Sequence, residues 1–245
     1  MTRFQPIIRK QVPIGAFENL LYWGQKIPGL AGYLFYRQLK KKFATRSASA
    51  WQKVVNDLGK GDVCIDLGAN VGNKTLQLAQ TGAEVFAFEP DPIAFARMVT
   101  SIGIGKNITL IQKAAWHEAG DLLMTRPKRS DFDLEEASGG SSLVRGGRSR
   151  DYSNAFLVEA VDFPNFLEGL DRHIRLIKID IEGAEWQVLD ALLAHPVARR
   201  IDCIFVETHE WVNNRSFVPE VLELQRQVET MRRPYVSLFW NHLHN

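Results

Sequence analysis

Acidic side chains stand at the ends of apolar runs in this chain, where a carboxylate can bind a cofactor or accept a proton. Asp66 closes one such run and is followed by Gly68 and Gly72. Glycine lets the backbone turn sharply and approach a ligand closely, and the helix expected next offers its N-terminal N–H groups. Glu89 follows the next apolar run. A carboxylate there can accept two hydrogen bonds from a ribose diol, so the pattern predicts a ribose-bearing cofactor.

The residues around these glycines discriminate between cofactors. A dinucleotide fingerprint has the spacing G-x-G-x-x-G, but Asn70 takes the middle position here, so no glycine approaches a pyrophosphate. We expect Asp66 to point its charge into the cleft. There it would repel a pyrophosphate and suit the cationic amino group and sulfonium of S-adenosylmethionine. The sequence therefore favours methyl transfer over the hydride transfer of a nicotinamide-dependent oxidoreductase.

A second group of polar residues follows two further apolar runs: Asp180, Glu182, Glu207 and His209. A hydroxyl acceptor loses its proton as it receives a methyl group, and each of these side chains is a candidate general base. His209 has the ordinary pKa nearest neutrality. Asp180, Glu207 and His209 are also a candidate ligand set for a divalent metal that would orient the acceptor. The sequence leaves both roles open.

Lys178 lies inside one of these runs and shares a strand face with Asp180. A lysine within a sheet that is covered on both faces is costly unless it is paired with an acid. The partner expected from position is Asp66 or Glu207.

These polar residues need a scaffold that brings several strand ends together. Runs rich in Val, Ile, Leu and Phe alternate with helical patterns, which is typical of parallel strands buried on both faces. We expect strands at 63–67, 84–88, 107–112, 174–180 and 201–206, helices at 73–81, 91–102, 183–193 and 218–231, and a closing apolar run at 234–240. The predicted fold is α/β, with a doubly wound, mostly parallel sheet whose ligands bind beyond the carboxyl ends of the strands.

Two segments depart from this alternation. Residues 1–50 are punctuated by Pro and Gly and predict an N-terminal helical cap, which leaves 51–245 as the cofactor-binding domain. Residues 126–150 are charged and rich in Gly and Ser, and such long connections are often lids, so we expect a lid-like insertion there. Residues 156–161 alternate enough to form an additional, edge strand.

The cap carries a basic stretch interleaved with aromatic residues: Arg37, Lys40, Lys41, Lys42 and Arg46 among Tyr33, Phe35, Tyr36 and Phe43. A cationic, aromatic-rich helix of this kind can contact a lipid-linked or anionic substrate or a membrane surface. The alternative is a solvated helix face whose aromatic residues pack on the main domain.

Length and composition narrow the class of protein. At 245 residues, one α/β domain with an extension is favoured over two domains. The net charge of +2 is too small to imply a nucleic-acid partner. Cys64 and Cys203 lie separately within apolar runs, which favours a reducing compartment. We find neither a secretory leader nor a span of about 18 apolar residues, so the expectation is a soluble, cytoplasmic protein.

Five strings of residues together resemble the FkbM-type methyltransferases. They are DLGANVG at 66–72, FEP at 88–90, GSSL at 140–143, KIDIEGAE at 178–185 and VETH at 206–209. The resemblance implies a class I methyltransferase-like fold and O-methylation of acceptors such as sugar hydroxyls and polyketide macrolides. It assigns Asp66, Gly68, Asn70, Gly72 and Glu89 to the cofactor, and Asp180, Glu182, Glu207 and His209 to the cleft.

Further residues are expected beside the cofactor: Thr75, Pro90, Gln112, Ala114 and Asp180. The adenine contacts are placed at Gln112 and Ala114. The chain departs from the family pattern here, because the family commonly has an asparagine before a small residue after the third strand, and this chain has Lys113.

The function predicted is an S-adenosylmethionine-dependent O-methyltransferase acting on a hydroxyl of a carbohydrate or other small, natural-product-like acceptor. A nucleic-acid methyltransferase is the alternative that the basic cap and the arginines of the insertion motivate: Arg126, Arg129, Arg145, Arg148 and Arg150. Base methylation by flipping needs a dedicated pocket, and the chain has neither an Asn/Asp-Pro-Pro-Tyr/Phe element nor a Pro-Cys pair. We therefore expect no nucleic-acid partner.

Overall fold

A six-stranded parallel sheet forms the centre of the protein in the computed structural model, which describes residues 12–103, 105, 107–127, 140–143, 150–209 and 218–241. The strand order is β3-β2-β1-β7-β8-β9, and every pair is parallel. The strands are β1 (Val63–Leu67), β2 (Glu84–Phe88), β3 (Ile108–Ile111), β7 (Ile174–Ile179), β8 (Ile201–Val206) and β9 (Tyr235–Ser237). The predicted α/β fold is confirmed, and the closing apolar run supplies β9.

The connections run in opposite directions on the two sides of β1. From β1 the chain moves outward to β2 and β3, and it later returns to form β7 beside β1 and continues to β8 and β9. A parallel sheet opens a crevice at such a reversal, beyond the carboxyl ends of the two strands. The gap between β1 and β7 is therefore where the fold itself places a ligand.

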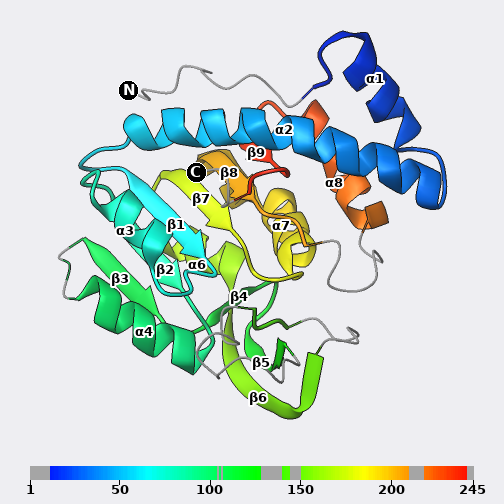
Figure 1. Ribbon diagram of the computed structural model, residues 1–245. Coiled ribbons are helices and arrows are strands. Elements are labelled where there is room, and N and C mark those ends of the chain that lie inside the picture. Colours follow the sequence, from blue (N-terminus) through cyan, green and yellow to red (C-terminus); the bar gives the residue numbers. More distant parts are fainter. Residues whose placement is uncertain are drawn as a thin grey trace.

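Helices cover both faces of the sheet (Figure 1). They are α3 (Asn73–Ala79), α4 (Pro92–Ile102), α6 (Phe163–Leu170), α7 (Glu185–Ala194) and α8 (Val218–Thr230), with a short 3₁₀ helix η1 (Pro196–Arg200). Alternate residues of β1 enter different apolar clusters: Val63 and Ile65 pack on one side and Cys64 on the other. Cys64 and Cys203 are free, buried thiols.

The N-terminal segment is a helical hairpin of α1 (Gly15–Gly24) and α2 (Leu30–Asn56). Helix α2 lies across the sheet (Figure 1), and Tyr36, Phe43 and Trp51 on its inner face are fully buried. These aromatic residues pack on the main domain, as the second interpretation of the cap expected. Because α2 continues through residue 50, the expected boundary between cap and domain falls inside one helix.

A second, smaller sheet lies below the carboxyl end of the main one (Figure 1). It consists of β4 (Ala114–Trp116), β5 (Gly120–Pro127) and β6 (Arg150–Asp162), in the order β4-β6-β5. The additional strand expected at 156–161 is confirmed as part of β6. Its expected place at an edge was wrong, because β6 is the central strand and pairs on both sides. Within the expected lid, 128–139 and 144–149 lie outside the described residues.

Candidate active site

A cavity of about 450 Å³ opens beyond the carboxyl ends of β1, β2 and β7, at the reversal of strand order. Pockets for small molecules and cofactors commonly have volumes of this size. The second sheet supplies the opposite wall. The lining residues are Leu67, Gly68, Ala69, Asn70, Val71, Asn73, Lys74, Phe88, Glu89, Pro90, Ala114, Ala115, Met124, Ser141, Leu143, Lys178, Asp180, Ile181 and Glu182.

The turn after β1 requires glycine at position 68. Gly68 has a φ of +74°, and a Cβ there would lie 1.8 Å from the carbonyl oxygen of Asp180. The ends of β1 and β7 can approach this closely only because no side chain separates them. Asn70 has a φ of +51°, an uncommon conformation for a residue with a side chain that is often associated with functional sites.

Glu89 is fixed against this turn from the end of β2. Its carboxylate accepts hydrogen bonds from the backbone N–H groups of Asn70 (2.8 Å) and Asp91 (2.9 Å). Burial raises the pKa of Glu89 to about 7, although both backbone N–H groups act in the opposite direction. Glu89 lines the cavity, so its carboxylate is an oriented acceptor of hydrogen bonds at the place where the sequence analysis expected a ribose.

Asp66 does not face the cavity, which corrects the expectation that its charge points into the cleft. It is fully buried, and its carboxylate accepts a hydrogen bond from the Thr75 hydroxyl at 2.7 Å. The strand register places Asp66 directly beside Lys178, and the Lys178 Nζ lies 3.1 Å from Oδ1 of Asp66. The adjacent cation accounts for this orientation, and Asp66 is the partner of Lys178 rather than Glu207.

Lys178 connects the buried acid to the cavity. Its Nζ donates to the carbonyl oxygen of Gly68 (2.7 Å) and lies 3.5 Å from Oδ2 of Asp180. Burial alone would lower its pKa, but the Asp66 and Asp180 carboxylates outweigh burial and raise the pKa of Lys178 above its ordinary value. The lysine is therefore a fixed cation that holds Asp180 in place at the end of β7.

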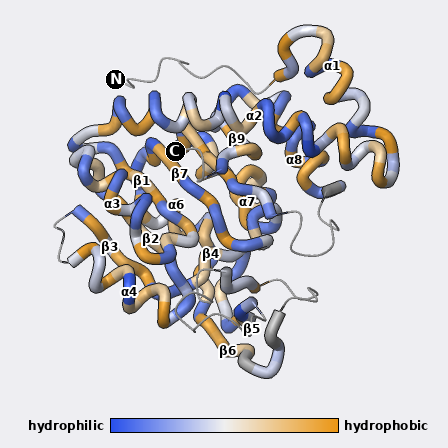
Figure 2. The backbone as a smooth tube through the Cα atoms, viewed as in Figure 1, coloured by the Kyte–Doolittle hydropathy of each residue, from blue (hydrophilic) through white to orange (hydrophobic). Residues whose placement is uncertain are grey.

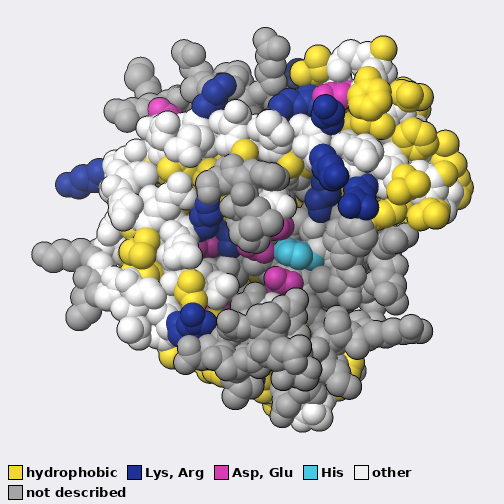
Figure 3. All heavy atoms as spheres, in the orientation of Figure 1, with side chains coloured by type: hydrophobic (Ala, Val, Ile, Leu, Met, Phe, Trp, Pro, Cys, Tyr) yellow, Lys and Arg dark blue, Asp and Glu magenta, His cyan; other side chains and the backbone are white. Residues whose placement is uncertain are grey.

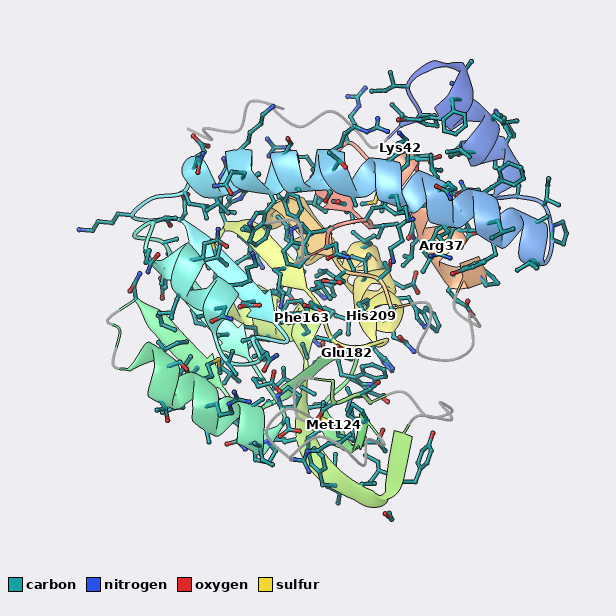
Figure 4. All side chains as sticks on the ribbon, in the orientation of Figure 1. Arg37, Lys42, Met124, Phe163, Glu182 and His209 are labelled. Carbon is teal, nitrogen blue, oxygen red and sulfur yellow. The ribbon has the colours of Figure 1, made fainter. Side chains whose placement is uncertain are left out.

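Three of the four predicted cleft residues come together: Asp180, Glu182 and His209. The Nε2 atom of His209 lies 3.8 Å from Oδ1 of Asp180 and 3.9 Å from Oε1 of Glu182. Figure 4 shows Glu182 and His209 near each other at this edge of the sheet, and Figure 3 shows acidic side chains beside a histidine near the centre of one face. Ligand atoms from these three residues lie within 4.8 Å of one another.

Glu207 is not part of this group. It is 8% exposed, and the candidate metal ligands that come together among the described residues include Glu182 in its place. The expected metal set of Asp180, Glu207 and His209 is thereby corrected. Position 207 follows β8 directly, whereas residue 182 follows a turn in which Glu182 has a φ of +56°, and that turn brings its carboxylate back beside the strand ends.

Glu185 organises the loop after β7, a role that the sequence analysis missed. The buried carboxylate accepts from the N–H groups of Ile181 (3.1 Å) and Gly183 (3.0 Å) and lies 2.8 Å from Nδ1 of His209. Burial lowers the pKa of His209, but the contact with Glu185, together with Glu182 and Asp180, raises it to about 10. The ring therefore carries a positive charge at neutral pH, with Nε2 directed at the two acids.

The segment 140–143, whose GSSL string is part of the family resemblance, closes one side of the cavity. The sequence alone gives these residues no role. The Ser141 hydroxyl donates to Asp91 (2.6 Å), and the Ser142 hydroxyl donates to the carbonyl oxygen of Glu182 (2.6 Å). Arg126 also binds Asp91 through two N–H groups, each at 3.0 Å. The GSSL string thus connects the second sheet to the loop after β2 and to the loop after β7.

Predicted cofactor residues divide into two sets. Six line the cavity: Gly68, Asn70, Glu89, Pro90, Ala114 and Asp180. Four are not among the lining residues: Asp66, Gly72, Thr75 and Gln112. Thr75 supports Asp66, Gly72 precedes α3 as its N-cap, and Gln112 is exposed because β3 ends before it. Met124 and Leu143 line the cavity but were not predicted, since no local pattern relates them to the strand ends.

The order of the parallel strands reverses at β1, and a cofactor-sized cavity lies there between the Glu89 carboxylate and the acidic cluster. This arrangement is that of an α/β enzyme with a methyltransferase-like fold. Comparison with known families identifies it further: residues 66–229 match the model of the methyltransferase FkbM domain. The chain belongs to this family.

A curated relative is consistent with this membership. The chain is 21% identical over 210 residues to the hexuronic acid methyltransferase AglP of Haloferax volcanii, and the match covers 83% of this chain and 81% of the relative. Among the described residues, no helix has both the length and the apolar character needed to cross a membrane.

Proposed function

We propose that this protein is an S-adenosylmethionine-dependent O-methyltransferase that transfers a methyl group to a hydroxyl of a carbohydrate or other small acceptor. The observation that carries the proposal is the cavity lined by Glu89 on one side and by Asp180 and Glu182 on the other. Family membership supports methyl transfer. The free, buried thiols support the proposed cytoplasmic location.

The residues present fit the cofactor in size and in charge. A cavity of about 450 Å³ suits a nucleoside with an amino-acid tail. Glu89 would accept hydrogen bonds from the ribose hydroxyls, and the acidic cluster would face the cationic amino-acid end of the cofactor. Lys74 and Lys178 also line the cavity. Asp66 lies 3.1 Å behind Lys178 and balances its charge, so the three lining carboxylates outnumber the one remaining lysine.

The cofactor supplies an activated methyl group, and the chain supplies a base and an orientation for the acceptor. The acceptor hydroxyl loses its proton in this reaction, and a carboxylate of the chain would accept it. We assign the role of general base to Asp180, which lines the cavity. Its carboxylate is held between Lys178 (3.5 Å) and His209 (3.8 Å). His209, a cation bound to Glu185, is a positioning residue that keeps Asp180 and Glu182 close together despite their like charges.

A divalent metal at Asp180, Glu182 and His209 is the second assignment that the cluster allows. Carboxylate and imidazole are suitable ligands for such ions. A metal would bind Nε2 of His209 and therefore displace its proton, so the two assignments exclude each other and can be tested with a chelator.

A carbohydrate acceptor is favoured by the relative named a hexuronic acid methyltransferase. One of the arginines that suggested a nucleic-acid substrate is engaged within the protein, because Arg126 is bound to Asp91. This weakens the nucleic-acid alternative. The nicotinamide alternative would need pyrophosphate at the turn where Asn70 stands beside Glu89.

Replacing Glu89 by Ala should lower the affinity for S-adenosylhomocysteine about a hundredfold, because two charge-assisted hydrogen bonds are worth about 3 kcal/mol. Isothermal titration calorimetry measures the change. Glu84→Ala is the matched control, since Glu84 begins the strand that Glu89 follows but is paired with Arg172 on the surface. Equal affinity in the Glu89→Ala and Glu84→Ala proteins, or no binding by the wild type, contradicts the proposal.

The raised pKa of Glu89, about 7, predicts that cofactor affinity depends on pH. Only the ionised carboxylate accepts two hydrogen bonds from a diol, so affinity should fall as pH drops below the pKa. Between pH 8 and pH 6 the fraction ionised, and with it the affinity, should fall about tenfold. Calorimetry at both pH values should give this change in the wild type and a flat response in Glu89→Gln. A pH-independent wild type would show that Glu89 does not contact the ligand through its charge.

A further inference from the structure

The helical hairpin at the N-terminus exposes an apolar face that the rest of the described chain leaves uncovered. Large hydrophobic side chains that are 49–64% exposed recur through α1, the connection and the start of α2: Ile14, Phe17, Leu20, Trp23, Ile27, Leu30 and Leu34. Figure 3 shows hydrophobic side chains gathered over α1, at the upper right, and Figure 2 shows the same concentration along the tube. We call these seven residues the hairpin face. Contiguous apolar surface of this kind marks an interaction site.

The opposite side of α1 already packs against α2, so the hairpin face is not the side on which α1 joins the protein core. Leu21 and Gly24 of α1 are buried against α2. A Cβ at Gly24 would lie 2.5 Å from the ring of Phe35. The two helices of the hairpin are therefore closely packed through their inner faces. The aromatic and aliphatic side chains of the outer face point to solvent.

Positive charge surrounds the hairpin face. Residues 12–46 contain six Lys and Arg residues and a single acid, Glu18, whereas the whole chain has a net charge of only +2. Arg37, Lys41 and Lys42 are exposed on α2. Glu18 is bound to Arg46 at 2.5 Å. The Nζ of Lys26 lies over the Trp23 ring, 4.0 Å from its centre.

We propose that the hairpin face docks on the surface of a bilayer that contains anionic lipids. Apolar and aromatic side chains flanked by Lys and Arg match the composition of helices that lie in the boundary between headgroups and acyl chains. Basic residues beside the membrane gain free energy from anionic headgroups. The apolar face and its charged border thus match the two layers of a bilayer surface.

The charge of the hairpin argues against a second copy of this chain as the occupant. In a two-fold symmetric dimer the same patch meets itself, so the basic residues around one hairpin face would lie against those around the other. Like charges placed together in this way oppose association. An anionic lipid surface reverses the sign of that interaction.

Docking in this manner brings the active site toward the membrane. Basic side chains on the visible face lie between the hydrophobic region and the acidic side chains near the centre (Figure 3), and Figure 4 shows Arg37 on α2 with His209 below it. Lys40 of α2 donates to the backbone and hydroxyl oxygens of Thr208 at 2.8 and 3.1 Å. The hairpin and the loop carrying His209 are therefore connected directly.

Co-sedimentation of the full chain with vesicles tests the proposal. Vesicles of phosphatidylcholine with added phosphatidylglycerol should bind at least about tenfold more protein than phosphatidylcholine alone, and added salt should weaken this binding. The double variant Phe17→Ser/Trp23→Ser and the double variant Lys41→Glu/Lys42→Glu should each lose about tenfold in binding to the mixed vesicles.

Matched controls separate the hairpin from general effects. Leu157→Ser removes an equally exposed apolar side chain on β6, and Lys53→Glu reverses an exposed charge at the far end of α2; both should bind vesicles like the wild type. Far-UV circular dichroism and the urea midpoint should be unchanged in every variant, which verifies folding without reference to the proposed function. Absence of vesicle binding by the wild type overturns the proposal, as does a concentration-dependent dimer that Phe17→Ser/Trp23→Ser dissociates.

Discussion

Replacing Asp180 by Asn is expected to lower kcat for methyl transfer by about 10²–10⁴-fold, the usual effect of removing a general base. Asn has nearly the same shape as Asp but cannot accept the acceptor proton. The neighbouring groups that hold the side chain, Lys178 and His209, remain in place. A radiochemical assay with a hexuronic acid glycoside measures the rate, and calorimetry with S-adenosylhomocysteine measures cofactor affinity, which should change less than kcat.

Glu182→Gln is the matched comparison, because Glu182 lines the same cavity and lies at nearly the same distance from His209. We expect its kcat to fall less than about tenfold, whereas the kcat of Asp180→Asn should fall by the full amount given above. The reverse result would transfer the role of base to Glu182. If a chelator abolishes activity and Mg²⁺ or Mn²⁺ restores it, the cluster binds a metal and the assignment of His209 as a protonated residue is wrong.

The central sheet could be predicted from the sequence because its strands are buried on both faces. Strands of this kind form short continuous apolar runs, and the predicted range 84–88 coincides with β2. The second sheet could not be predicted in the same way. β4 is apolar but has only three residues, and most of β5 is at least partly exposed, so neither gives an apolar run as long as those of the central strands. The position of β6 in its sheet depends on these two partners.

The candidate site was predictable where a residue follows a strand and less so where it lies within one. Glu89 comes after the last residue of β2 and lines the cavity, as expected. Asp66 comes before the last residue of β1, so its direction depends on the neighbouring strand, and only the register with Lys178 determines it. Residues such as Met124 enter the cavity from the second sheet, through tertiary contacts that local sequence does not encode.

The pair formed by Lys178 and Asp66 should be among the most sensitive points for folding. Replacing Lys178 by Met leaves the fully buried Asp66 carboxylate without its cation. Removing one partner of a buried ion pair typically costs about 3–5 kcal/mol of the free energy of unfolding. Urea denaturation followed by circular dichroism measures the loss. Lys113→Met is the control, because the Lys113–Glu159 ion pair is exposed and such pairs contribute about 1 kcal/mol or less.

The double variant Lys178→Met/Asp66→Asn separates the uncompensated charge from the loss of lysine itself. If the buried charge is the main cost, the double variant should recover about half or more of the stability lost by Lys178→Met, because a neutral amide at position 66 can still accept from the Thr75 hydroxyl. A double variant no more stable than the single one would assign the effect to the hydrogen bond from Lys178 to Gly68 instead. Since that bond holds the glycine turn against β7, cofactor affinity would then fall in parallel with stability in both variants.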